Sequence, residues 1–190
     1  MRRQYKTIII FLVVFTVITG IVYPLLVTGI AQIAFSHQAN GSLIEQNGIA
    51  VGSELIGQSF SDPKYFWGRL SATSPVPYNG DASSGSNLGP SNLDLMQAVQ
   101  ARIDALKAVD PDNHLPVPVD LVTFSASGLD PDISVAAAHY QTARVARYRG
   151  LSQDLVAGLV SQFTEERQFG ILGEPRVNVL QLNQALDTLK

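Results

Sequence analysis

The sequence contains no cysteine at all. This absence excludes thiolate catalysis, cysteine-ligated zinc sites, lipoprotein-type acylation and iron–sulfur clusters. It leaves the compartment open, because a domain outside the cytoplasm can fold without disulfides. The 155 residues that follow Phe35 are enough for one compact domain that buries its core without a disulfide or a metal.

Runs of basic residues are also missing. Three of the 13 Lys and Arg residues lie before the apolar N-terminal stretch, and the part of the chain after Phe35 holds the other ten together with all 16 Asp and Glu residues. That part therefore has a formal net charge of −6. Binding of nucleic acid through its phosphates requires clustered positive charge, so this class of function is excluded.

Three catalytic signatures are absent as well. No Gly-Lys-Ser/Thr sequence forms a phosphate-binding loop, no HExxH sequence pairs histidines for zinc, and no GxSxG elbow presents a serine nucleophile. The histidines His37, His114 and His139 are scattered, and Ser125 and Ser127 have no predictable base. We therefore predict a chain without catalytic residues, a metal site or a tightly bound cofactor. A tethered extracytoplasmic enzyme or binding domain unrelated to transport is the alternative.

Charge is missing altogether from residues 8–35, IIIFLVVFTVITGIVYPLLVTGIAQIAF. As a helix this stretch would be about 42 Å long, more than the roughly 30 Å of bilayer hydrocarbon, which predicts a transmembrane helix. The alternative is a cleaved signal peptide, but the apolar region of such peptides has only about 7 to 15 residues. Three basic residues precede the span and none follows it until Lys64, so we predict a cytoplasmic N-terminus at 1–7 and an extracytoplasmic domain.

The span has features that a simple anchor does not require. Pro24 removes a backbone hydrogen-bond donor, and Gly20 and Gly29 present small surfaces to a neighbouring helix. Glycine and proline are also ordinary in transmembrane helices, which is the alternative interpretation. We predict that one face packs against other membrane helices, with the candidate contact residues Gly20, Tyr23, Pro24, Thr28, Gly29 and Gln32.

After a polar connector at 36–48, the sequence predicts a single α+β domain over residues 49–190. A strand or strand pair is expected within 49–60, and a further strand over 117–123. The stretch 73–92 is dominated by Ser, Gly, Asn and Pro, which predicts a long loop.

Four helices are predicted in this domain from capping residues and from apolar residues spaced by three and four. Their expected bounds are Ser91 as N-cap to about Pro111, about 134–149, about 152–168, and from Asn178 onward. Helices of this length with only short strands between them favour the α+β class.

Residues 63–69, PKYFWGR, hold three aromatics between two cations. Two interpretations are open, an exposed binding surface or a buried aromatic cluster with cations stacked at its edge. Asp120, Asp130 and Asp132 near the turn SGLDPD suggest either a cation site or, as we favour, turn and helix-start residues. The candidate partner contacts outside the membrane are Tyr65, Phe66, Trp67, Arg69, Ser84, Gly85 and Asn87.

Several blocks of the sequence resemble one known family from end to end. They are YPLLVTGIAQ (23–32), QANGSLI (38–44), VGSELIGQ (51–58), PKYFWGR (63–69), SSGSNLGPSN (83–92), VPVDLVT (117–123), SGLDPDIS (127–134) and GEPRVNVL (173–180). In this order they are similar to the C-subunit family of the bacterial Kdp potassium-transporting ATPase. The chain departs from the family pattern at Leu70, where proline is usual, and at Phe124, where a small residue is usual.

The resemblance implies a non-catalytic accessory subunit that stabilises and assembles a high-affinity potassium uptake complex in the bacterial inner membrane. The implied partners are a catalytic P-type ATPase subunit, a channel-like potassium-binding subunit and a small membrane subunit, which handle ATP and potassium. Such C subunits have been proposed to raise the ATP affinity of the catalytic subunit, as a catalytic chaperone. A domain outside the cytoplasm cannot touch cytoplasmic ATP, so we do not expect direct contact with the nucleotide. We expect its acidic surface to cap the outer potassium entrance.

Overall fold

The computed structural model describes residues 2–46 and 48–189. The chain divides into two compact units, Met1–Leu43 and Ile44–Lys190, and each is described by itself. Asn47, half of a predicted Asn-Gly turn, lies outside the described residues. The other half, Gly48, has a φ of 76°, a backbone conformation that glycine adopts at little cost.

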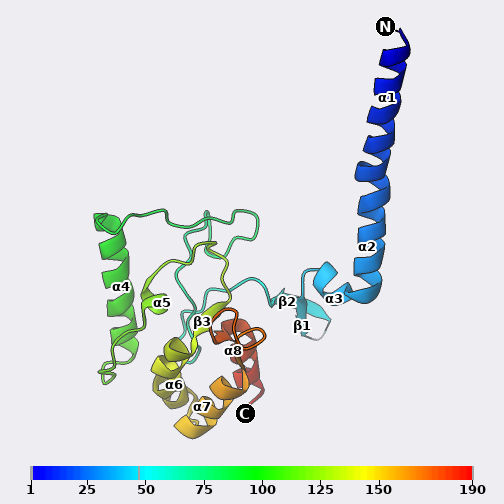
Figure 1. The fold of residues 1–190 in the computed structure, drawn as a ribbon. Coiled ribbons are helices and arrows are strands. Elements are labelled where there is room, and N and C mark those ends of the chain that lie inside the picture. The colour runs from blue at the N-terminus through cyan, green and yellow to red at the C-terminus, as the bar shows by residue number, and fades with distance from the viewer. Residues whose placement is uncertain (1, 47, 190) are drawn as a thin grey trace. The chain divides into compact units, whose positions relative to one another are not determined.

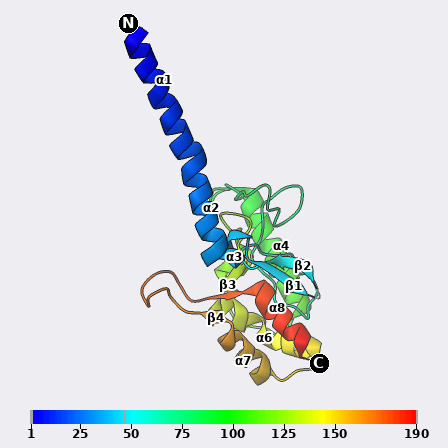
Figure 2. The same cartoon turned by 90° about the vertical axis from the view of Figure 1, so that its right-hand side faces the viewer.

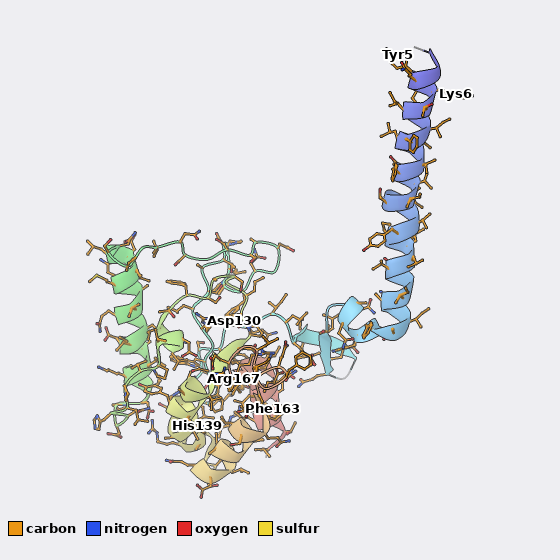
Figure 3. The ribbon with its side chains drawn as sticks, viewed as in Figure 1. Tyr5, Lys6, Asp130, His139, Phe163 and Arg167 are labelled. Atoms are coloured by element: carbon orange, nitrogen blue, oxygen red, sulfur yellow. The ribbon has the colours of Figure 1, made fainter. Side chains whose placement is uncertain are left out.

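The first unit is a long apolar helix followed by a short one (Figure 1). The long helix consists of α1 (Arg2–Val17), the π-helical segment η1 (Ile18–Val22) and α2 (Tyr23–Ala34). Residues Gln4–Ala34 are long and apolar enough to cross a membrane, and their most apolar part is not buried by the rest of the chain. Figure 3 shows side chains projecting from all sides of this helix, with Tyr5 and Lys6 at its N-terminal end. The helix therefore begins before Ile8, where the sequence predicted the span to start.

Pro24 explains the π-helical segment. Proline has no N–H for the carbonyl four residues earlier, here that of Gly20, and its ring clashes with that carbonyl in a regular α-helix. A wider turn before the proline relieves the clash. The Tyr23 N–H accordingly bonds the Ile18 oxygen five residues back, which is the π-helical pattern. Pro24 thus changes the local helical geometry without ending the helix.

A pair of side-chain amides holds the end of the long helix. The helix ends at Phe35, whose φ of −139° is not helical, and the short helix α3 (Ser36–Ala39) follows. Gln32 and Asn40 exchange amide hydrogen bonds at 3.3 and 3.4 Å, and Asn40 also donates to the Ser36 carbonyl at 2.7 Å. Gln32, a predicted contact for other subunits, is therefore engaged within its own unit.

The second unit mixes helices with short strands (Figures 1 and 2). Its helices are α4 (Leu93–Val109), α5 (Val119–Val122), α6 (Val135–Arg149), α7 (Gln153–Gln162) and α8 (Val179–Thr188). This mixture, joined to one N-terminal apolar helix, agrees with the predicted combination of helix and sheet.

The strands form two small sheets. A two-stranded sheet pairs β1 (Leu43–Gln46) with β2 (Ile49–Ser53). The second sheet is antiparallel in the order β3-β5-β4, made of β3 (Asp132–Ser134), β4 (Thr164–Glu165) and β5 (Arg176–Asn178). Strand β2 confirms the strand expected within 49–60, while β1 lies in the segment predicted to be a connector.

Side-chain caps determine where the helices begin. Ser134, Ser152 and Asn178 each accept a hydrogen bond from an N–H in the first turn of α6, α7 and α8. The sequence predicted helix starts at all three positions. Helix α4 is instead capped by Asn92, one residue after the predicted Ser91, and the Asn92 side chain accepts from the Asp94 N–H.

Two predicted elements differ from the structure. Helix α7 ends at Gln162 and not near Gln168, because Glu165 pairs with β5 as part of a strand. The stretch 117–123 was expected to be a strand, but Val119–Val122 forms one helical turn. The two interpretations are hard to separate from such a short apolar pattern, because periodicity does not distinguish a short strand from a buried helical turn.

The hydrophobic core of the second unit collects residues from its helices and from the β3-β5-β4 sheet. Its fully buried members include Phe66, Leu106, Leu121, Ile133, Val145, Val156, Val177, Leu182 and Leu186. Arg144, in the middle of α6, is equally buried, with 1% of its surface exposed. A buried guanidinium requires hydrogen-bond acceptors on several sides, and segment 63–69 supplies them.

Candidate functional site

The aromatic segment 63–69 contributes to the core of the second unit. Phe66 and Trp67 are 0% and 5% exposed, so the hypothesis of an exposed aromatic surface is wrong for these two residues. The guanidinium carbons of Arg102 and Arg144 both lie 4.9 Å from the centroid of the Trp67 ring. The alternative that the sequence left open, a buried aromatic cluster with stacked cations, is therefore confirmed, with the cations supplied by α4 and α6.

Two buried amides hold the backbone of this segment. Asn183 on α8 accepts from the Phe66 N–H at 2.9 Å and donates to the Phe66 carbonyl at 3.0 Å. Gln141 on α6 likewise accepts from the Trp67 N–H at 2.9 Å and donates to the Trp67 carbonyl at 3.1 Å. Each amide takes the place that a neighbouring strand has in a sheet, because it satisfies one buried N–H and one buried carbonyl.

Arg144 completes this arrangement. Its guanidinium donates to the Pro63 and Tyr65 carbonyls and to the Gln141 amide oxygen. Burial lowers the pKa of Arg144 to about 10, and Asp110 opposes this shift. The group still carries its charge at neutral pH, and within the described residues it is stabilised by carbonyl and amide oxygens and by the Trp67 ring, without a carboxylate ion pair.

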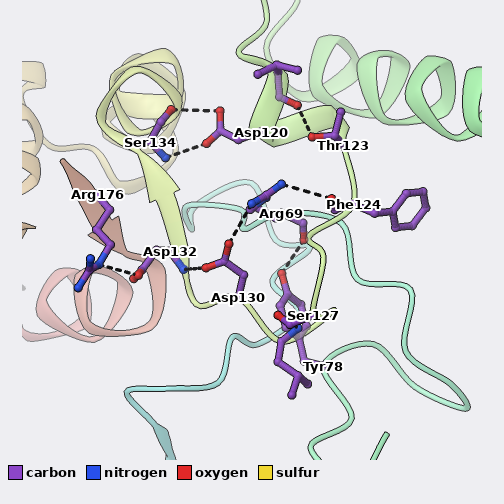
Figure 4. A network of polar contacts seen from close by, with 12 residues as sticks. Arg69, Tyr78, Asp120, Thr123, Phe124, Ser127, Asp130, Asp132, Ser134 and Arg176 are labelled. Atoms are coloured by element: carbon purple, nitrogen blue, oxygen red, sulfur yellow. Dashed lines mark hydrogen bonds and ion pairs between the residues drawn. The ribbon is translucent and has the colours of Figure 1, made fainter. Parts of the chain in front are cut away.

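Arg69 joins three segments at a polar junction (Figure 4). Its guanidinium pairs with Asp130 at 3.0 Å and donates to the Phe124 carbonyl at 3.3 Å. Its own carbonyl accepts from the Tyr78 hydroxyl at 2.6 Å, and burial raises the pKa of Tyr78 to about 12, so this donor keeps its proton. Leu70 and Phe124, the two departures from the family pattern, face each other in a parallel β-bridge beside the junction.

The loop 73–92 contains neither helix nor strand, as predicted, and it is fastened to the turn that precedes β3. The Ser84 N–H donates to the Ser127 carbonyl at 2.9 Å. A Cβ at Gly85 would lie 2.8 Å from the Ala126 oxygen, so only glycine fits there without a shift. Gly85 thus has a packing role, whereas the other two loop candidates, Ser84 and Asn87, are exposed.

The aspartates near this turn serve the fold, as the favoured interpretation predicted. Besides Asp130, Asp132 pairs with Arg176 at 2.9 Å, and Asp120 accepts from the N–H and hydroxyl of the capping Ser134 at 2.7 and 3.0 Å (Figure 4). Burial raises the pKa of Asp132 although Arg176 opposes the shift. Among the described residues, no group of three His, Cys, Asp or Glu side chains is arranged to hold a metal ion.

A cavity of about 120 Å³ lies next to the junction, lined in part by Arg69, Arg102 and Tyr78. Arg102 donates to the carbonyls of Leu121 and Gly68 at 3.0 and 2.8 Å, and burial lowers its pKa. The described lining contains neither carboxylate nor imidazole, and therefore offers no general base and no set of metal ligands. Its volume suits a few water molecules and is far below that of a nucleotide site.

In the first unit the predicted contact positions lie in η1 and α2. A Cβ at Gly20 or Gly29 would meet no atom within 4 Å, so both glycines leave open space on the helix surface. Tyr23, Pro24 and Thr28 are exposed within this unit. The described structure thus leaves these five positions accessible to neighbouring helices.

The sequence did not single out the polar residues that organise the core, namely Gln141, Arg144 and Asn183. Each lies in a helix, and apolar periodicity does not show which polar side chain turns inward. One signal was present, because Gln141 and Arg144 are three residues apart and such positions share a helix face.

Comparison with known proteins finds relatives over the whole chain. The family model described as "K+-transporting ATPase, c chain" matches residues 5–188. The potassium-transporting ATPase KdpC subunits of Herpetosiphon aurantiacus and Methylococcus capsulatus are 64% and 60% identical to the chain, covering all of it and 98% and 100% of their own length. That of Paraburkholderia phytofirmans is 58% identical over all of the chain and 99% of its own length. The chain therefore belongs to the family of the c chain, or KdpC subunit, of the K+-transporting ATPase.

Proposed function

We propose that this accessory subunit of the potassium-transporting ATPase is anchored in the cell membrane by the helix Gln4–Ala34, with the unit Ile44–Lys190 outside the cytoplasm. The observation that carries the proposal is the helix itself, which is apolar throughout its centre and has basic residues only at its start. Basic residues that flank a span on one side favour the cytoplasm for that side.

The helix also provides contact with partner subunits in the membrane. Gly20 and Gly29 allow close approach of another helix, and the π-helical turn before Pro24 alters the shape of the face that is presented. We propose that the partners are a catalytic P-type ATPase subunit, a channel-like potassium-binding subunit and a small membrane subunit. In this arrangement the chain stabilises and assembles the complex.

The outer unit acts as an acidic cap over the potassium entrance. Its net charge of −6 raises the local concentration of cations through a long-range field. This effect requires no dedicated potassium site on the chain. Potassium and ATP are handled by the partner subunits, and the chain has no catalytic duty of its own.

An effect on ATP affinity, which the resemblance implies, would reach the catalytic subunit through subunit contacts. In this topology the second unit lies outside the cytoplasm, where cytoplasmic ATP does not reach it. Among the predicted outer contacts, Tyr65, Ser84 and Asn87 are at least partly accessible for such contacts, while Phe66 and Trp67 are buried.

Cysteine labelling tests the topology, because the natural chain has no cysteine. Leu115, which is 61% exposed in the second unit, is changed to cysteine in one variant, and Gln4 in another. In sealed right-side-out vesicles that contain the whole complex, a membrane-impermeant maleimide should label Leu115→Cys directly and Gln4→Cys only after permeabilisation. The reverse order of labelling would refute the proposed orientation.

Removal of residues 44–190 tests the role of the outer unit. The truncated chain is expressed with the other subunits, and complex recovery and the potassium affinity of uptake are measured. We expect at least one of the two to fall. Retention of both at the level of the full chain would contradict assembly and capping by this unit.

A further inference from the structure

The connection between β4 and β5 carries an exposed apolar tip formed by Phe169, Ile171 and Leu172. These side chains are 92%, 75% and 54% exposed. Figure 2 shows the connection, in orange, extending away from α6, α7 and α8. Single exposed apolar residues are normal on protein surfaces, but three on one projecting turn form a patch that usually marks an interaction site.

The tip is preformed and held away from the core. Gln168 and Leu172 exchange two backbone hydrogen bonds, both at 2.9 Å, and Arg167 forms an ion pair with Glu174. At the base, Arg176 on β5 pairs with carboxylates on both neighbouring strands. These contacts fix the direction of the hairpin, so its own unit does not cover the apolar tip.

Phe169 occupies a position in this turn whose backbone conformation is unfavourable for a bulky residue. Phe169 and Gly170 have φ values of 53° and 75°, and the Ile171 N–H donates to the Gln168 carbonyl at 3.2 Å, so two left-handed residues form a β-turn inside the three-residue loop that Gln168 and Leu172 close. Asn or Gly suits the first of these positions, whereas a positive φ is an outlier for a bulky aromatic residue. Residues with backbone strain of this kind cluster at functional sites, so the strain at Phe169 points to a role for its side chain.

The charges around the tip distinguish between a lipid surface and a protein. Segments that lie on membranes are flanked by basic residues, which anionic lipids attract. Here the hairpin carries three carboxylates and two guanidinium groups, from Glu165, Glu166, Arg167, Glu174 and Arg176. This balance is slightly acidic and belongs to a unit with a net charge of −6, so an anionic lipid surface is disfavoured.

We infer that the tip Phe169–Leu172 inserts into an apolar pocket, with a neutral or basic rim, on another subunit of the same ATPase. Aromatic residues, Phe included, are enriched at protein–protein interfaces, and a rigid support lowers the entropic cost of ordering the contact on binding. This inference rests on the proposed function, because it requires that the chain works within the complex. Beyond the proposed function, the inference identifies the segment by which the outer unit binds its partner subunit.

The variant Phe169→Asn tests the inference in the full chain, expressed together with the other subunits. Asparagine accepts the positive φ, so thermal stability should be unchanged or higher, while recovery of the partner subunits with the tagged chain should fall about 10-fold or more. The matched control is Leu115→Asn, which changes an exposed apolar residue in a different loop of the same unit. Unchanged recovery with Phe169→Asn, or an equal loss in the control, would overturn the inference.

A label at the tip identifies what covers it. Ile171→Cys leaves Phe169 in place and gives the chain a single thiol for a polarity-sensitive fluorophore, which we expect to shift to the blue in the assembled complex only. A blue shift of the isolated chain in nanodiscs of phosphatidylcholine and phosphatidylglycerol, or a concentration-dependent shift in detergent, would assign the tip to lipid or to self-association and overturn the inference. Normal assembly with a solvent-exposed label refutes the tip contact alone, whereas failure of the natural chain to assemble refutes the proposed function.

Discussion

The buried amides of Gln141 and Asn183 lead to a quantitative prediction about stability. Each is 1% exposed, and each satisfies one backbone N–H and one carbonyl of the aromatic segment, at Phe66 or Trp67. In Asn183→Leu the branched shape and the number of side-chain heavy atoms are conserved, but the N–H and carbonyl of Phe66 lose their partners in a dry core. The change therefore isolates the cost of unsatisfied backbone groups.

The expected magnitude follows from the number of groups left unpaired. An unsatisfied buried donor or acceptor costs about 1–3 kcal/mol, so Asn183→Leu should lower the free energy of unfolding by about 2–6 kcal/mol. Gln141→Met should cost at least as much, because the Gln141 amide oxygen also accepts from the buried Arg144 guanidinium. The two effects are expected to be non-additive, since both amides hold neighbouring residues of one segment.

Urea unfolding of the full chain in detergent measures these values. Trp67 is the single tryptophan and is buried, so its fluorescence reports on the second unit. Gln100→Met on the exposed side of α4 is the control, and it should change stability by less than about 0.5 kcal/mol. A cost below about 1 kcal/mol for Asn183→Leu would refute the idea that the amide substitutes for a strand.

Three further predictions concern the junction and the core. Burial raises the pKa of Tyr78 to about 12, so the stability that its protonated hydroxyl contributes should be complete below about pH 10 and should disappear as the pH rises through about 12. The free energy of unfolding of the natural chain and of Tyr78→Phe, measured at pH 8 and 11.5, should differ less at the higher pH. An equal difference at both pH values would contradict this prediction. Gly85→Ala should destabilise the second unit by about 1–3 kcal/mol in thermal or urea unfolding, because its Cβ meets the Ala126 oxygen at 2.8 Å, whereas Gly89→Ala, with open space around it, should be nearly neutral. Arg144→Lys should cost about 2–4 kcal/mol by the same assay, because a single ammonium cannot replace the planar guanidinium that bonds two carbonyls and an amide; stability equal to that of the natural chain would show that charge alone suffices.

The sequence located the features that depend on neighbouring residues in the chain. The apolar span, the helix starts near Ser134, Ser152 and Asn178 and the loop 73–92 all follow from local composition and spacing, and all are present in the structure. Local sequence patterns gave wrong predictions where a segment distant in the sequence determines the secondary structure. Residues after Gln162 continue the helical pattern, but pairing with β5 makes them a strand.

By itself, then, the sequence determined the long apolar helix, most of the other helices and, through its motifs, the family. Only the tertiary structure decided that Phe66 and Trp67 are core and not surface, because their partners Asn183 and Gln141 are 117 and 74 residues away in sequence. It alone showed the strained, exposed Phe169. Burial and hydrogen bonding between distant segments depend on how the whole chain packs. The pattern of apolar residues within one helix or loop does not show which distant segment packs against it.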